Sequence, residues 1–101
     1  MSSGYGYFCP CGQLCLTLPC TAETLRHREY DTFYVLDLKM PHVDHLTKDE
    51  PFCIVRKDGG YELRTALQCR RCGLTCAYAL ENAPGYIYLN PTLLKEKTVT
   101  L

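Results

Sequence analysis

Cys9-Pro10-Cys11-Gly12 and Cys69-Arg70-Arg71-Cys72-Gly73 are the two stretches that decide the fold. A tight cysteine turn brings two thiolates to ~3.8 Å, the sulfur separation on a tetrahedral zinc ion with Zn–S bonds of ~2.3 Å. The C-P-C spacing is short, but side chains two apart on an extended chain share a face, and the proline restricts the turn. The glycine after each pair lets the chain leave the turn with positive φ. We therefore predict one four-cysteine site that binds one Zn²⁺ per chain through Cys9, Cys11, Cys69 and Cys72.

The totals of the sequence predict one domain. The chain has 101 residues, which is the size of a single small domain. We expect this zinc-binding domain to span residues 1–101, with loose termini at residues 1–6 and 96–101. Acidic and basic residues balance at eleven each, so the formal net charge is zero. Such a balance does not by itself demand a nucleic acid or an acidic membrane as partner.

The N-terminus indicates which compartment the cysteines belong to. Eight cysteines in a short chain are typical of either a disulfide scaffold or a metal site. Residues 1–8 contain no basic residue and no apolar run, so they do not resemble a secretory signal peptide. No stretch approaches the ~20 apolar residues that cross a bilayer. We expect an intracellular protein, cytoplasmic or nuclear and not secreted, with reduced cysteines and zinc.

Hydrophobic alternation predicts a mainly β fold with little helix. The clearest signal is a hairpin whose arms, residues 52–57 and 61–68, flank the turn Asp58-Gly59-Gly60. Its second arm leads directly into Cys69. In that arm Glu62, Arg64 and Gln68 share one face, and the other face carries Tyr61, Leu63, Thr65 and Leu67.

The remaining segments complete a zinc-ribbon-like domain of about six short strands. Further strands are predicted at residues 14–18, 33–38, 74–80 and 86–89. Short helices are predicted at residues 22–29 and 91–95, a long loop at residues 39–51, and a turn at residues 82–85.

Several motifs together resemble the STING ER-exit protein family over residues 7–95. The matching residues are Tyr7-Phe8-Cys9, Cys11-Gly12-Gln13, Leu18, Cys20, Arg28, Asp31, Val35-Leu36-Asp37, Arg56, Gly60, Glu62, Arg64, Cys69, Cys72-Gly73-Leu74, Tyr78 and Asn82-Ala83-Pro84. The resemblance implies a zinc-binding domain. It also implies a role in moving a membrane protein out of the endoplasmic reticulum, while other members associate with nuclear RNA-processing assemblies.

Three other constellations have alternative interpretations. A second zinc site could use the four remaining cysteines, which are Cys15, Cys20, Cys53 and Cys76. Only Cys15 and Cys20 are even loosely paired, so burial of all four thiols is favoured. His42, Asp44 and His45 resemble part of a metal site but have no third strong ligand, which favours a solvated loop. Arg70 and Arg71 would lower the pKa of a redox C-x-x-C, yet strand patterns flank this motif where a catalytic pair would open a helix.

We predict a non-catalytic, monomeric module that binds a protein partner, as an adaptor in export of membrane proteins from the endoplasmic reticulum. Its expected partner surface is Arg56, Tyr61 and Arg64 on the hairpin, flanked by residues 39–51. The alternative is a component of a nuclear, splicing-associated complex with weak RNA contact. That contact would use a basic surface with interleaved tyrosines, formed by Arg56, Lys57, Arg64, Arg70, Arg71, Tyr61, Tyr78, Tyr86 and Tyr88. A thiol or zinc-dependent enzyme is the third possibility.

Overall fold

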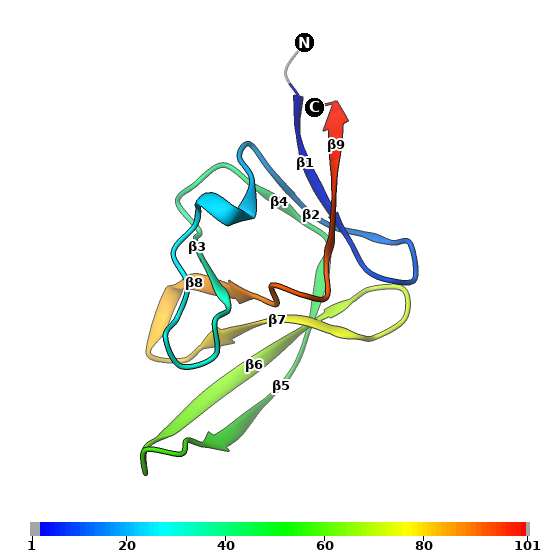
Figure 1. The fold of residues 1–101 in the computed structure, drawn as a ribbon. Helices are drawn as coiled ribbons and strands as arrows, with labels where there is room; N and C mark the ends of the chain where they lie inside the picture. Colours follow the sequence, from blue (N-terminus) through cyan, green and yellow to red (C-terminus); the bar gives the residue numbers. More distant parts are fainter. Residues whose placement is uncertain (1–2, 101) are drawn as a thin grey trace.

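The computed structural model describes residues 3–100 and is almost entirely β-structure (Figure 1). Its elements are β1 (Ser3–Phe8), β2 (Leu14–Leu18), the 3-10 helix η1 (Ala22–Thr24), β3 (Tyr34–Asp37), β4 (Val43–Asp44), β5 (Leu46–Val55), β6 (Tyr61–Cys69), β7 (Thr75–Leu80), β8 (Ala83–Leu89) and β9 (Lys95–Thr100). The predicted mainly β, zinc-ribbon-like class is confirmed, as are the hairpin of β5 and β6 and the strands at β2, β3 and β7.

The strands form two antiparallel sheets. Sheet A has the order β4-β2-β1-β9, and sheet B has the order β3-β8-β7-β6-β5. Apolar side chains alternate along these strands, and those from both sheets meet in one core. The buried members of this core are Tyr7, Leu16, Leu18, Ala22, Leu36, Leu67, Ala77, Ile87 and Leu89.

The two ends of the chain pair with each other, so the predicted loose termini are wrong for residues 3–6 and 96–100. Strands β1 and β9 run antiparallel from Ser3 opposite Thr100 to Phe8 opposite Lys95. The hydroxyl of Tyr7 donates to Glu96 Oε1 (2.6 Å) and accepts from the Ala22 amide (2.7 Å). A buried aromatic residue thus ties both ends to the core; residues 1–2 and 101 lie outside the described part of the chain.

Four local predictions are also wrong, because tertiary pairing overrides local propensity. The helix expected at residues 22–29 is reduced to η1. The loop expected at residues 39–51 contains β4 and most of β5, which pairs with β6 on both sides of an irregularity between Lys48 and Pro51. The helix expected at residues 91–95 is a turn in which the Asn90 side chain accepts the amides of Thr92 and Leu93. The turn expected at residues 82–85 ends early, since β8 begins at Ala83.

One face of β6 is charged and buried. Glu62 and Arg64 each expose only 8% of their surface, because the segment of residues 25–33 folds over this face of sheet B. Arg28 in that segment places Nη2 2.5 Å from Glu62 Oε2, and Arg64 Nε donates to Glu62 Oε1 at 2.9 Å. The hydroxyl of Tyr78 accepts from Arg28 and donates to Asp31.

We call this group the charged cluster: Arg28, Asp31, Glu62, Arg64 and Tyr78. Its two guanidinium groups balance its two carboxylates, so a dehydrated network remains electrically neutral. The guanidinium of Arg64 also lies 3.9 Å from the centre of the Tyr78 ring, within cation–π range. The hydrogen bond from Arg28, opposed by burial and aided by Arg64, lowers the pKa of Glu62 to about 2. The cluster therefore anchors residues 25–33 to the sheet.

We expect Glu62→Gln to destabilise the fold by about 3–5 kcal/mol at pH 7, because it leaves two buried guanidinium groups facing one carboxylate. The folded pKa of Glu62 lies below its ordinary value of ~4.3, so its ionisation contributes fully above that value and is lost as the pH falls toward 2. Urea unfolding from pH 7 to pH 3 measures both effects. Glu81→Gln, at an exposed position, is the control. A loss below about 1 kcal/mol in Glu62→Gln would show that the cluster does not anchor the segment.

Candidate metal centre

Two hairpin tips with the same backbone pattern approach each other, one from each sheet (Figure 1). The first knuckle, residues 9–13, joins β1 to β2: the Cys9 amide donates to Gln13 O (2.9 Å), and the Gly12 amide donates to Cys9 O (2.8 Å). The second knuckle, residues 69–74, joins β6 to β7. There the Cys69 amide donates to Leu74 O (2.8 Å), and the Gly73 amide donates to Cys69 O (2.9 Å). The strands thus hold both tips rigidly.

Glycine is required in each knuckle by backbone conformation and not by space. Gly12 has φ 95° and Gly73 has φ 80°. A Cβ atom at either position would meet nothing within 4 Å. Positive φ is strained for residues with a side chain, so glycine lets each tip turn back into its second strand.

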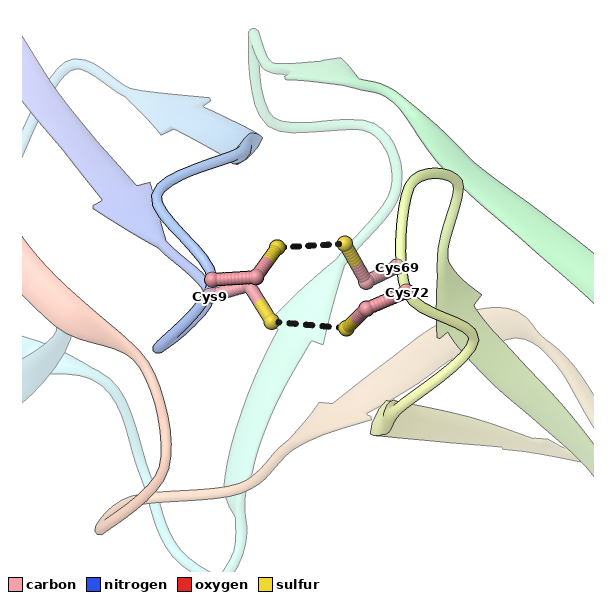
Figure 2. A group of neighbouring side chains, drawn as sticks. Cys9, Cys69 and Cys72 are labelled. Atoms are coloured by element: carbon pink, nitrogen blue, oxygen red, sulfur yellow. Dashed lines mark hydrogen bonds between the residues drawn. The ribbon is translucent and has the colours of Figure 1, made fainter.

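The four predicted cysteines lie together at this junction. Figure 2 shows Cys9 of the first knuckle facing Cys69 and Cys72 of the second. Cys9 Sγ lies 3.4 Å from Cys72 Sγ, and Cys11 Sγ lies 3.6 Å from Cys69 Sγ. All four sulfur atoms lie within 4.8 Å of one another. These distances exceed the ~2.05 Å of a disulfide and approach the sulfur separation around a tetrahedral metal, so the group can hold one metal ion.

The surroundings of the sulfurs differ in ways that affect ionisation. Burial raises the pKa of Cys9. Burial also opposes ionisation of Cys69, but the backbone amides of Cys72 and Arg71 stabilise its thiolate and lower its pKa to about 6. Arg71 reaches the first knuckle, where its Nη1 donates to Cys11 O (3.4 Å). A metal ligand must be a thiolate, and this site already favours one.

Two further cysteines pack against the cysteines of the knuckles. Cys15 and Cys76 are fully buried and pack against Cys9 and Cys69. Their thiols donate to Gln13 O (3.5 Å) and Leu74 O (3.3 Å), and burial raises the pKa of Cys15 to about 12. They are therefore protonated packing groups. The sequence contains a signal for this shared role that the loose spacing of Cys15 and Cys20 did not reveal. The pattern C-G-x-x-C occurs twice, at residues 11–15 and 72–76, so Cys15 and Cys76 occupy equivalent positions.

The residues of the two alternative metal sites, which the sequence disfavoured, stay apart. Within residues 3–100 the four knuckle cysteines are the one group of three or more Cys, His, Asp or Glu side chains close enough to share an ion. Cys20 is half-buried, and Cys53 is exposed, so the expectation that all four remaining thiols are buried or half-buried is wrong for Cys53. The ring of His42 bonds to Met40 O (2.7 Å) and does not join His45 in a site.

The structure separates the residues predicted to form a partner surface. Tyr61 is 76% exposed, but Arg56 is half-buried between Asp58 and Glu62, and Arg64 is buried in the charged cluster. The expectation that Arg64 faces a partner is therefore wrong. The predicted basic, tyrosine-bearing surface for RNA is not assembled either, because Tyr78 and Tyr88 are buried as well.

Comparisons with known proteins agree with the resemblance noted in the sequence. Residues 2–100 match the family described as the STEEP1 domain. A protein of Schizosaccharomyces pombe named "ER exit protein" is 54% identical over 97 residues, which cover 96% of this chain and 84% of that relative. Within residues 3–100 no helix is long and apolar enough to cross a membrane.

We expect Gly12→Ala and Gly73→Ala each to destabilise the protein by about 1–2 kcal/mol, the cost of a left-handed backbone at alanine. Gly85→Ala is the matched control, because its Cβ would also meet nothing within 4 Å and its φ is not positive. Chemical denaturation measures all three. If the knuckle variants are as stable as the control, the positive φ at the tips is not required.

Proposed function

Because the chain belongs to the STEEP1 domain family, we propose that it is a non-catalytic, zinc-binding interaction module that acts in the export of membrane proteins from the endoplasmic reticulum. The relative in S. pombe is named for exit from this compartment, and the similarity extends over nearly the whole chain. We place the module on the cytoplasmic side of the membrane, where export adaptors contact their partners and thiols stay reduced.

The approach of four sulfurs from two sheets is the observation that supports zinc binding. Cys9, Cys11, Cys69 and Cys72 would hold zinc as thiolates. When bound, the ion supplies a crosslink between the tip of β1–β2 and the tip of β6–β7. A structural zinc of this kind contributes on the order of 10 kcal/mol at neutral pH, which is comparable to the whole stability of a small domain.

The same geometry supports a non-catalytic role over a thiol or zinc-dependent enzyme. Four thiolates complete a tetrahedral shell, so no position remains for water or substrate. Catalytic C-x-x-C pairs use the N-terminus of a helix to stabilise the thiolate, whereas Cys69 and Cys72 lie between β6 and β7. What remains available for function is the surface of the module.

We expect one zinc ion per chain in protein purified under reducing conditions, measured by elemental analysis together with native mass. Cys69→Ser removes one ligand, so it should lose stoichiometric zinc and the cooperative unfolding transition. A folded, metal-free Cys69→Ser protein would contradict the zinc assignment.

Three matched cysteine variants serve as controls for this experiment. Cys53→Ser changes an exposed thiol and should keep both zinc and stability. Cys15→Ala and Cys76→Ala should keep zinc but lose roughly 1–3 kcal/mol of stability through the lost packing beneath the knuckles. Loss of zinc in any of the three would overturn the ligand assignment.

We expect this chain to restore export in S. pombe cells that lack the related ER exit protein. The measurement is the fraction of newly made membrane proteins retained in the endoplasmic reticulum. Glu81→Gln, at an exposed position outside the knuckles and the β5–β6 hairpin, should restore export as well as the unchanged chain does. Cys69→Ser should fail because its fold is lost. No rescue by the unchanged, zinc-loaded chain would count against a shared function.

A further inference from the structure

The hairpin of β5 and β6 carries an apolar face that no other described element covers. Val55 and Tyr61 lie opposite each other across the two strands and are 78% and 76% exposed. The next pair on the same face is Cys53 and Leu63, both exposed. Figure 1 shows this hairpin extending away from the rest of the fold. We call these four residues the apolar face: Cys53, Val55, Tyr61 and Leu63.

The apolar face is continuous with the core. Leu67, further along the same side of β6, is buried against sheet A, but sheet A does not reach the outer end of the hairpin. The opposite side of β6 carries Glu62 and Arg64, which are buried in the charged cluster. The hairpin therefore exposes its apolar side and buries its charged side, a pattern expected where a partner covers the apolar residues.

The outer edge of β5 is also available for pairing. Within residues 3–100, β5 is the last strand of sheet B and pairs with β6 alone. The first half of β5 is protected from pairing with the strands of other molecules by charged residues and a proline, which are Lys48, Asp49, Glu50 and Pro51. The register of β5 with β6 also shifts between Lys48 and Pro51. The second half, Phe52–Val55, has neither charge nor proline. An uncharged free edge with backbone donors and acceptors is a template for an added strand.

Size and charge decide among possible occupants. The four side chains of the apolar face, one of them aromatic, offer far less than the ~800 Å² per partner of a standard interface, so a second copy of the chain is disfavoured. A bilayer is disfavoured because the tip that would enter it first carries Lys57 and Asp58. The apolar face itself carries no charge, which selects an apolar ligand over an acidic or basic one.

We propose that a protein partner binds here through a short extended apolar segment, which pairs with the edge of β5 at Phe52–Val55 as an additional strand of sheet B. Alternate side chains of this segment would lie beside Cys53 and Val55 on one face and beside Phe52 and Ile54 on the other. The inference rests on the proposed function, since it names the surface by which the module meets its partner.

The test uses short peptides selected from a random display library on the zinc-loaded chain, then measured by fluorescence anisotropy. The test variant is Val55→Lys with Tyr61→Glu, because opposite charges on a cross-strand pair preserve the hairpin while removing its apolar surface. Val43→Lys, at a 53% exposed position in β4, is the control.

We expect selected peptides with apolar residues at alternate positions, and at least a tenfold loss of affinity in the double variant, equivalent to about 1.4 kcal/mol. The unchanged chain and Val43→Lys should bind alike, and bound peptide should slow hydrogen exchange at residues 52–55. Equal binding to the double variant would overturn the proposal. So would binding only to phosphatidylcholine–phosphatidylserine vesicles, or self-association that the double variant abolishes.

The export assay separates this inference from the proposed function. If the double variant keeps zinc and rescues export fully, the hairpin is not the partner surface, although the module still acts in export. If the unchanged chain fails to rescue, the proposed function fails regardless of the hairpin.

Discussion

The meeting of four cysteine sulfurs from two hairpin tips is the constraint on which the rest of the structure depends. One pair comes from β1–β2 in sheet A and the other from β6–β7 in sheet B, so the site joins the two sheets at one point. In the unfolded chain, bringing the two cysteine pairs together closes a long loop, and this closure costs conformational entropy. Among the described residues, the two sheets share a core of nine buried side chains. A zinc ion bound at the knuckles, as proposed, would fix how these sheets meet, so the small core would not have to specify their orientation alone.

A second, independent anchor lies on the other face of sheet B. There the charged cluster uses arginine, glutamate and tyrosine where an apolar layer would be expected. Such a cluster tolerates fewer arrangements than packed aliphatic side chains, since each donor needs its own acceptor. The segment of residues 25–33, which connects η1 to β3, is held by directional bonds and not by a helix or strand of its own. Several of the residues that carry the family resemblance, among them Arg28, Glu62 and Tyr78, belong to this cluster, which gives them a structural role.

The sequence predicted what short-range patterns determine. Cysteine spacing and the following glycines identified the four clustered sulfurs, and Asp58-Gly59-Gly60 identified the hairpin, because both are encoded within a few residues. The exposure of Arg64 was predicted wrongly because its burial depends on Arg28 and Tyr78, which are distant in sequence. Strand β9 was missed because Lys95, Glu96 and Lys97 resemble a solvated tail until β1 supplies their partner. The twofold C-G-x-x-C pattern was the one local signal available for Cys15 and Cys76.

The pairing of β1 with β9 has a consequence for the architecture of larger assemblies. Ser3 and Thr100 are neighbours at one end of the molecule, and the tip of the β5–β6 hairpin lies at the opposite end (Figure 1). A domain whose first and last strands are adjacent can be spliced into a surface loop of an unrelated host protein without separating the ends of that loop. The fold is therefore suited to insertion as a domain into another protein, with the β5–β6 hairpin directed away from that host.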